Sequence, residues 1–342
     1  MQRTAEIVAN ARQAGIAIPA FNIPYLPMMA PVIQAVADLD SFALVAVARL
    51  EWIKFESRSL AAVRAEFERC QDPAHVRLHL DHVPVVDEDG LTVDYLPIIE
   101  EAIGLGYQSA MVDGSRLELA ENIAATRRAV ELAHAAGIAC EAELGAVMGH
   151  ESGPAIPYDE LFASGKGFTD VGEATRFVAE TGCDWLSVAV GNVHGAISAA
   201  LKDRKKVTAR LNLERLEQLA GATRIPLVLH GGSGIGQEDL RAAVQAGIAK
   251  VNIATEIRQA YESALRSSGS VAAGQQAVYD RTHWLIQDFF GWAGISGPAR
   301  EREGGWGTAE KLTQRRQDAE AVSCSWRTRP VPRQTEMSLR GA

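Results

Sequence analysis

Three histidines of this chain follow or end apolar segments, and this placement suggests a shared metal site. The segment VRLHL precedes His82, WLSVAV precedes His194, and IPLVLH ends in His230. A single histidine at a strand end is more often a hydrogen-bonded structural residue than a ligand. Three histidines at one level, with a fourth coordination position open, form the arrangement of a catalytic zinc site. Their neutral nitrogens suit Zn²⁺ better than Mg²⁺ or Ca²⁺, which prefer oxygen ligands.

Carboxylates accompany these histidines at the ends of similar segments. Asp81 directly precedes His82, Asp113 follows YQSAMV, Glu143 lies in GIACEAEL, and Glu151 ends the loop GAVMGHE. A positioned carboxylic acid can move a proton to or from a substrate oxygen, which contributes about 10²–10⁴-fold to a rate. Asp81 and His82, side by side at one strand end, could therefore serve such chemistry together. The alternative is an aspartate that caps a strand end next to a packed histidine.

Glycines follow the seventh apolar segment, in the stretch LHGGSGI. Gly231, Gly232 and Ser233 come directly after His230, and the next segment, KVNIAT, ends at Thr255. Consecutive glycines allow backbone N–H groups to approach an anion closely. If the chain is a barrel, the loops after strands seven and eight are its usual phosphate site. A tight turn without a ligand is the alternative interpretation.

Eight short apolar segments must position these side chains, and helical patterns separate them. Nearly continuous apolar runs suit strands that are buried on both faces. The predicted strands are 15–21, 42–48, 76–80, 107–112, 137–144, 185–190, 225–230 and 250–255. The predicted helices between them are 28–39, 59–70, 96–106, 118–137, 171–182, 212–221 and 236–247. Eight alternations predict an α/β fold of the (β/α)8 TIM-barrel type. A doubly wound sheet is the alternative, but no GxGxxG sequence follows the first strand.

The pattern divides the chain into two parts. Residues 1–290 form the predicted barrel domain, whose first helix would close the bottom of the barrel. Residues 291–342 lack apolar periodicity and are rich in Gly, Pro and Arg. We expect this C-terminal tail to be largely irregular, with one short helix near 308–322.

Composition excludes several classes of protein. The chain has 342 residues and a net charge of −9, which argues against a nucleic-acid partner. No apolar run approaches the length of a membrane span, and the N-terminal residues do not resemble a signal peptide. The four cysteines are scattered without CxxC spacing, so we expect reduced thiols and a cytoplasmic protein.

The motifs together resemble those of class II, zinc-dependent ketose-bisphosphate aldolases. LHLDH, MVDGS, EAELG, GHE, VAVGNVHG, LVLHGGSGI and KVNIATE occur in the family's order. The sequence is most similar to the tagatose-bisphosphate branch, because Ala254 replaces the Asp common in the fructose-bisphosphate branch. The resemblance covers roughly residues 5–265, and only the combined set of motifs is specific.

The resemblance implies a role for each candidate residue. His82, His194 and His230 match the zinc ligands, and Asp81 matches the proton donor that acts on the aldehyde oxygen. The residues that match those holding dihydroxyacetone phosphate are Gly195, Gly231, Gly232, Ser233, Asn252, Ala254 and Thr255.

Four further residues match family positions around the substrate or the metal. Asn22 matches a strand-one residue near the substrate, and Glu151 matches a mobile-loop carboxylate implicated in proton transfer at the nucleophilic carbon. Asp113 and Glu143 match acidic residues that orient the metal shell or hold a second ion.

The implied reaction is reversible cleavage of a ketose (bis)phosphate into dihydroxyacetone phosphate and an aldehyde. Zinc would stabilise the enediolate on the ketone fragment as a Lewis acid. A monovalent cation such as Na⁺ or K⁺ is a second candidate cofactor. The expected partner is a small sugar phosphate, and the expected assembly is a homodimer or homotetramer.

The sequence departs from the family on the aldehyde side. Ala48 stands where a serine commonly reaches the far phosphate, and Arg49 and Glu51 follow it. The loop after His194 lacks the usual Tyr–Lys. We hypothesise that the aldehyde is not glyceraldehyde 3-phosphate, and that Arg49 replaces the lost phosphate contact or selects an acidic aldehyde.

Two other functions fit parts of the pattern. One is a barrel hydrolase or epimerase that uses the same three-histidine metal site on a sugar phosphate. The other is a non-catalytic barrel subunit that supports a partner aldolase. The retention of all three histidines, Asp81 and Glu151 argues against the second.

Overall fold

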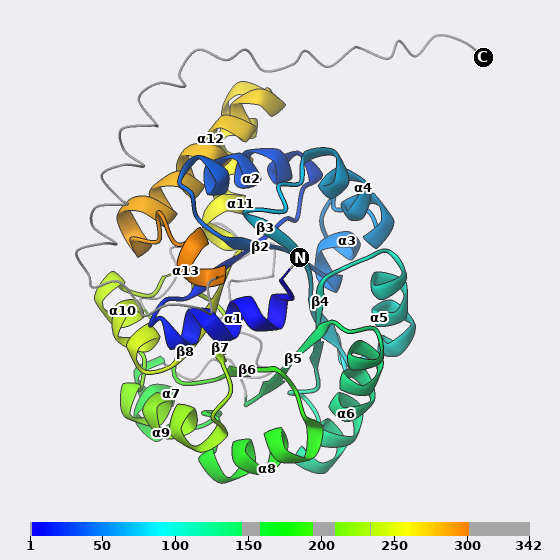
Figure 1. Cartoon of the computed structure of the whole chain (residues 1–342), viewed down its shortest axis with the longest axis vertical. Coiled ribbons are helices and arrows are strands. Elements are labelled where there is room, and N and C mark those ends of the chain that lie inside the picture. Colours follow the sequence, from blue (N-terminus) through cyan, green and yellow to red (C-terminus); the bar gives the residue numbers. More distant parts are fainter. Residues whose placement is uncertain (1, 146–157, 194–208, 233, 301–342) are drawn as a thin grey trace.

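The computed structural model describes residues 2–145, 158–193, 209–232 and 234–300, and these form one closed barrel (Figure 1). Eight parallel strands pair in chain order, and β8 pairs with β1. The strands are β1 (Ile18–Asn22), β2 (Ala43–Ala48), β3 (Val76–Pro84), β4 (Ser109–Asp113), β5 (Ala139–Leu144), β6 (Trp185–Val188), β7 (Leu227–Leu229) and β8 (Ile248–Ile253). The predicted (β/α)8 barrel is therefore confirmed.

Helices surround the strands, as Figure 1 shows. Those in the predicted places are α2 (Met29–Asp38), α4 (Leu60–Cys70), α5 (Tyr95–Gly104), α6 (Leu119–Ala135), α8 (Val171–Thr181), α9 (Leu213–Thr223) and α10 (Gln237–Gln245). Those that were not predicted are α3 (Arg49–Ile53), α7 (Tyr158–Ser164), α11 (Thr255–Ser268), α12 (Val271–Trp284), α13 (Ser296–Arg300), η1 (Leu26–Met28) and η2 (Leu285–Phe290). No described helix has both the length and the apolar content that crossing a bilayer requires.

Local chemistry explains where individual helices begin and end. The Asp170 side chain accepts a hydrogen bond from the Glu173 backbone N–H at 2.9 Å, which caps the start of α8. Gly182 ends α8 in the left-handed region. The pattern also suggests Gly221 as the left-handed end of α9, but this is wrong. The helix continues to Thr223, and Arg224 takes the left-handed conformation with φ of 59°.

Alternation along the strands creates two cores. Side chains such as Leu78 and Leu80 of β3 point outward into a cluster shared with the helices. Ile18, Leu44 and Trp185 belong to a second cluster, which lies inside the barrel and against the first helix. Above that inner layer the inward positions become polar, and these polar positions form the candidate site.

Helix α1 (Thr4–Gln13) closes the amino-terminal end of the barrel, as predicted. Its Ile7 and Val8 are fully buried in the inner cluster. Part of the segment after residue 290 also packs here, since the Asn10 amide donates a hydrogen bond to the Ala299 carbonyl at 3.5 Å. Residues 301–342, with the helix predicted near 308–322, lie outside the described residues.

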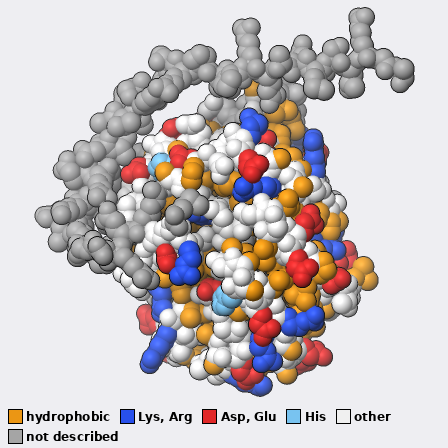
Figure 2. Space-filling model, turned by 45° about the vertical axis from the view of Figure 1, so that its right-hand side comes forward, with side chains coloured by type: hydrophobic (Ala, Val, Ile, Leu, Met, Phe, Trp, Pro, Cys, Tyr) orange, Lys and Arg blue, Asp and Glu red, His pale blue; other side chains and the backbone are white. Residues whose placement is uncertain are grey.

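The surface carries mixed charge. Figure 2 shows one face on which basic, acidic and apolar side chains are interspersed over the described residues. The described residues of this face therefore show no large field of one sign.

Candidate active site

An irregularity in β3 brings two consecutive residues to the same place. Side chains of a regular strand alternate between faces, so Asp81 and His82 would point in opposite directions. The register between β3 and β4 shifts between Leu80 and Val83. His82 sits in this shift with a positive φ of 34°, which is unusual for a residue with a Cβ. The strand end is thereby bent so that both side chains face the carboxyl-terminal mouth of the barrel.

His82 and His230 meet directly. Their rings lie with centroids 4.4 Å apart, and His82 Nε2 is 2.6 Å from His230 Nδ1. His230 follows β7 and is fully buried. Only one hydrogen can lie between two nitrogens at this separation, so at least one of them presents a lone pair to the other, and both nitrogens face the same space.

Carboxylates surround the imidazole pair on one side. Asp113 Oδ2 lies 3.4 Å from His82 Nδ1, and Glu143 Oε2 lies 3.4 Å from His230 Nδ1. Glu141 Oε1 lies 2.9 Å from the other nitrogen of His230. These contacts fix both rings, as second carboxylates commonly do for metal-ligating histidines.

Asp81 is held by amides from two other strands. The Asn22 side chain donates to Asp81 Oδ2 at 2.9 Å, and the Asn252 side chain donates to Asp81 Oδ1 at 3.0 Å. Asp81 itself is 1% exposed. Its two oxygens are thus fixed in orientation next to His82.

A buried lysine connects the two halves of this network. Lys250 Nζ lies 2.7 Å from Glu141 Oε2 and donates to Asn252 Oδ1 at 2.7 Å. His79 of β3 places Nε2 3.6 Å from both Asp81 Oδ1 and Glu141 Oε2.

The electrostatic environment favours positive charge at His82. Burial alone would lower the pKa of His82, but Asp81, Asp113 and Glu143 outweigh it and raise that pKa to about 10. Burial and the charge on His82 lower the pKa of His230. The site therefore attracts one unit of positive charge to the imidazole pair.

The acids of the site differ in their ionisation. Burial would favour neutral Asp81, but His82, the neighbouring His79 ring and Lys250 hold its pKa well below the ordinary value. Burial, with Asp113 adding to it, raises the pKa of Glu143 to about 8. Asp81 is consequently ionised near neutral pH, and Glu143 is easily neutralised unless a cation approaches.

These residues fit a metal ion. One ligand atom each from Asp81, His82 and His230 lies within 4.8 Å of the others, and the same holds for His82, Asp113 and Glu143. Facing imidazole nitrogens with adjoining carboxylates are a donor set for Zn²⁺ or a similar divalent ion.

The predicted phosphate loops lie beside this cluster in the chain and in space. Gly231 takes a positive φ of 68°, and the Gly232 N–H donates to the Asn252 carbonyl at 3.2 Å. A Cβ at Gly232 would come within 2.9 Å of that carbonyl oxygen. Ala254 and Thr255 stand at the start of α11. The close approach of these two loops explains the glycine at 232.

Four predicted site residues lie outside the described residues, namely His194, Gly195, Glu151 and Ser233. Among the described ones, the structure brings together Asn22, Asp81, His82, Asp113, Glu143, His230 and Asn252. Their roles stay predictions.

Sequence reasoning gave no site role to Glu51, His79, Glu141 or Lys250. For three of them a signal existed: His79, Glu141 and Lys250 each stand two residues before an assigned polar residue on the same strand. In a strand, such spacing places both side chains on one face. Glu51 carried no comparable signal, because it lies on the unpredicted helix α3.

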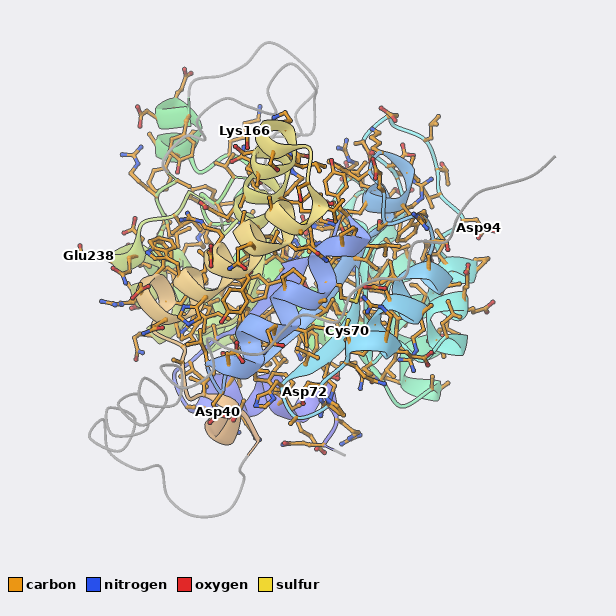
Figure 3. The ribbon with its side chains drawn as sticks, turned by 90° about the horizontal axis from the view of Figure 1, so that it is seen from above. Asp40, Cys70, Asp72, Asp94, Lys166 and Glu238 are labelled. Carbon is orange, nitrogen blue, oxygen red and sulfur yellow. The ribbon has the colours of Figure 1, made fainter. Side chains whose placement is uncertain are left out.

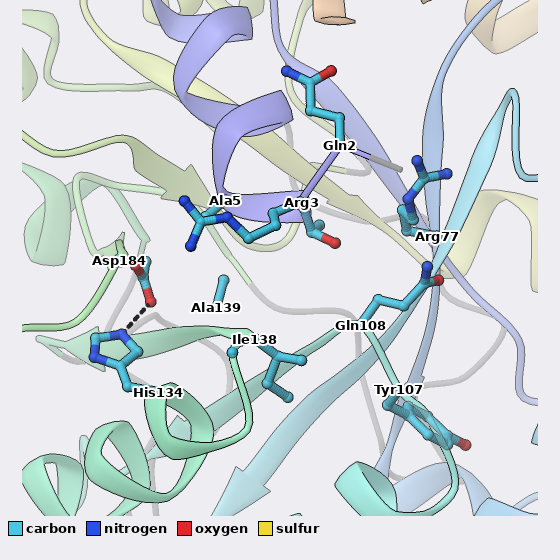
Figure 4. Close-up of a pocket in the computed structure, with 12 residues that line it drawn as sticks. Gln2, Arg3, Ala5, Arg77, Tyr107, Gln108, His134, Ile138, Ala139 and Asp184 are labelled. Atoms are coloured by element: carbon cyan, nitrogen blue, oxygen red, sulfur yellow. Dashed lines mark hydrogen bonds and ion pairs between the residues drawn. The ribbon is translucent and has the colours of Figure 1, made fainter.

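A cavity of about 450 Å³ lies at the opposite end of the barrel (Figure 4). Arg77, Gln108 and Asp184, which line it, stand at or just before the starts of strands, and Asp184 pairs with His134 at 2.9 Å. Barrel enzymes place their chemistry at the carboxyl ends of strands. We therefore assign this cavity no catalytic role.

Comparison with known proteins agrees with the resemblance. The chain is similar to the YdjI aldolase from Escherichia coli K12, with 29% identity, a TM-score of 0.68, and coverage of 86% of this chain and 98% of that chain. It is also similar to a putative fructose-1,6-biphosphate aldolase from Coccidioides immitis, with 27% identity, the same TM-score and the same coverage. The family model described as fructose-bisphosphate aldolase class-II matches residues 2–290. The chain therefore belongs to the class II fructose-bisphosphate aldolase family.

Proposed function

We propose that this protein is a metal-dependent aldolase that reversibly cleaves a ketose (bis)phosphate into dihydroxyacetone phosphate and an aldehyde. The observation that carries the proposal is the direct meeting of His82 and His230, with Asp81 beside them, at the carboxyl end of the barrel. Family membership supports the aldolase activity, while the substrate and metal are our inference.

The metal would be held by His82 and His230, with His194 as the third predicted ligand. Zn²⁺ is the ion that three imidazoles favour. When bound, it would supply Lewis-acid stabilisation of negative charge on the ketone fragment, typically several kcal/mol. Asp113 and Glu143 would orient the ligands or hold a second ion, for which a monovalent cation is a further candidate.

Asp81 would move the proton on the aldehyde side. In cleavage, the hydroxyl hydrogen of the scissile carbon passes to Asp81, the C–C bond breaks, and its electron pair stays with the ketone fragment. In condensation, Asp81 returns that proton to the aldehyde oxygen. Its fixed position between Asn22 and Asn252 supports this role, and its low pKa keeps the carboxylate ionised before the proton arrives.

The phosphate of the ketone fragment would bind where the loops after β7 and β8 meet. The glycines after β7 support this, because a loop without side chains lets backbone N–H groups approach an anion closely. Gly231, Ala254 and Thr255 would complete the described part of this cradle. Gly195, Ser233 and Glu151 stay predictions for phosphate binding and for the proton at the nucleophilic carbon.

The identity of the aldehyde fragment is less constrained than that of the ketone fragment. Arg49 Nη1 lies 3.5 Å from Asp87 Oδ2, so an acidic aldehyde would compete with Asp87 for this guanidinium. We keep the hypothesis that glyceraldehyde 3-phosphate is not the natural aldehyde. Cleavage of both fructose and tagatose bisphosphates at ordinary aldolase rates would contradict it.

The test combines metal analysis with a substrate panel. We expect the purified protein to contain zinc and to release dihydroxyacetone phosphate from at least one ketose phosphate. A chelator should abolish release and added Zn²⁺ should restore it, while Asp81→Ala should lower turnover at least 10²-fold. Glu88→Gln, in a nearby loop, is the control that should stay active.

Two results would decide against the proposal. A metal-loaded protein that releases no triose phosphate from the panel would favour another three-histidine metal enzyme. A purified protein that neither binds zinc nor turns over substrate would favour a non-catalytic subunit. The cytoplasmic location and the homodimeric or homotetrameric assembly are separate predictions. Localisation in cells tests the first, and a measurement of molecular size in solution tests the second.

A further inference from the structure

Lys250 lies below the candidate site, on the same strand as one of the amides that hold Asp81. Lys250 and Asn252 are two positions apart on β8, so their side chains point to the same face of the strand. Lys250 is fully buried, and Asn252 is only 7% exposed. The strand therefore brings an ammonium and an amide together inside the barrel.

Two hydrogen bonds connect Lys250 to Asp81 through Asn252. The Lys250 ammonium donates to Asn252 Oδ1 at 2.7 Å, and Asn252 Nδ2 donates to Asp81 Oδ1 at 3.0 Å. His79 Nε2 lies 3.6 Å from the same Asp81 oxygen, which is beyond normal hydrogen-bond length. The Asn252 amide, rather than the histidine, therefore orients this oxygen of Asp81.

The chemistry of an amide makes this arrangement directional. An asparagine nitrogen only donates hydrogen bonds and its oxygen only accepts them, while an ammonium only donates and an ionised carboxylate only accepts. Rotating the Asn252 amide by half a turn would place its NH₂ against Lys250 and its oxygen against Asp81. Both hydrogen bonds would then be lost together, so Lys250 keeps the donor of Asn252 on Asp81.

We propose that Lys250 is a positioning residue, which fixes the Asn252 amide in the orientation that holds Asp81 for proton transfer. The inference rests on the proposed function, because it takes Asp81 as the group that acts on the aldehyde oxygen. Asn22 still donates to the other oxygen of Asp81, so the loss of Lys250 should impair the acid without releasing it.

The test must separate Asn252 from the other partner of Lys250, which is Glu141 at 2.7 Å. Lys250→Met alone would leave Glu141 as an uncompensated buried charge and could prevent folding. Glu141→Gln removes that charge and keeps an oxygen that can accept the hydrogen bond of His230. The comparison is therefore made between Glu141→Gln and Lys250→Met/Glu141→Gln, both loaded with Zn²⁺.

We expect Lys250→Met, in the Glu141→Gln background, to lower kcat for cleavage about tenfold or more, since small misplacements of catalytic groups are costly. Zn²⁺ affinity should stay within about twofold, because the partner of His230 is the same in both proteins. Lys54→Met in the same background is the matched control and should leave cleavage unchanged, since this lysine pairs with Glu88 on the surface.

A double-mutant cycle distinguishes positioning from general support of the fold. If Lys250 acts through Asn252, Lys250→Met should change cleavage less than about twofold once Asn252→Ala is also present, because coupled residues are not additive. A lysine that only supports the barrel would lower cleavage by the same factor with or without Asn252. That second result would overturn the inference.

A crystal structure of Lys250→Met/Glu141→Gln provides a readout that does not require turnover. We expect the Asn252 amide to turn or to move beyond hydrogen-bonding distance of Asp81. If Asn252 still donates to Asp81 as in the wild type, the inference is wrong. A wild-type protein without any aldol cleavage would instead refute the proposed function, while the position of Asn252 in this crystal would still decide the role of Lys250.

Discussion

Lys250 shows how one side chain can support two separate parts of a site. Its ammonium is fully buried and contacts Glu141, which holds His230, and Asn252, which holds Asp81. The imidazole pair and the acid are therefore linked through a single positive charge. A buried ammonium is stable only when such partners compensate its desolvation.

Removing the charge of Lys250 should lower the stability of the protein, and removing the charge of Glu141 as well should restore much of that stability. We expect Lys250→Met to destabilise the protein by about 3–5 kcal/mol, because Glu141 is left as an uncompensated buried charge. The double variant Lys250→Met/Glu141→Gln should recover most of that loss. Urea denaturation at equal metal content measures both effects. A single variant as stable as the wild type would contradict the role of Lys250.

At the scale of elements, the loops after β7 and β8 must approach each other closely. The Gly232 N–H bonds to the Asn252 carbonyl, and a Cβ at Gly232 would also meet the Val251 side chain at 2.6 Å. The neighbouring Gly236 differs, because it precedes α10 with an ordinary negative φ and an added Cβ would lie 3.7 Å from the Asp239 carboxylate.

This difference predicts opposite outcomes for two similar substitutions. Gly232→Ala should push the two loops apart and raise the KM for the ketose phosphate about tenfold or more, since phosphate contacts depend on close backbone approach. Gly236→Ala should change KM less than about twofold. Steady-state kinetics of both variants is the measurement. Equal effects of the two substitutions would show that the loop approach at Gly232 is not important.

At the scale of the whole molecule, a polar cluster around His75 connects segments that are distant in the chain, at the amino-terminal end of the barrel. His75 Nδ1 lies 2.7 Å from Asp72, and its Nε2 lies 3.3 Å from Asp40. Asp40 also accepts a hydrogen bond from Ser296, which starts α13. Figure 3 shows Asp40 and Asp72 near each other, at the end of the molecule opposite Lys166.

The cluster predicts a pH-dependent contribution to stability. The Asp40 hydrogen bond, together with Asp72, raises the pKa of His75 despite its partial burial. The stabilisation is complete below the unfolded pKa of about 6.5 and is lost as pH rises through the higher folded pKa. His75→Gln should therefore cost roughly 1 kcal/mol or less near pH 5, since both aspartates are partly exposed, and less near pH 9.

Thermal or urea unfolding at the two pH values measures this difference. His283→Gln is a suitable control, because that ring lies against Tyr279 rather than in the cluster. A destabilisation by His75→Gln that grows with pH would show that the ion pairs do not account for it.

The sequence alone was sufficient to predict the barrel and part of its site. Apolar strand segments and helical periodicity are local patterns, so all eight strands could be located within a few residues. The strand-end residues Asp81, His82 and His230 followed from the rule that barrel chemistry lies at the carboxyl ends of strands. Helix ends were less certain, because any residue that tolerates the left-handed region, such as Arg224, can replace a glycine.

Only the tertiary structure showed how the buried charges are paired. Closing the barrel brings Lys250 of β8 against Glu141 of β5, and brings Asn22 of β1 against Asp81 of β3. These partners are far apart in the chain, and nothing in their local sequence encodes the contact. The inward turn of His82 likewise depends on a register shift between two strands. Residue type and spacing determine which groups reach the mouth of the barrel, whereas their pairing and ionisation depend on long-range packing.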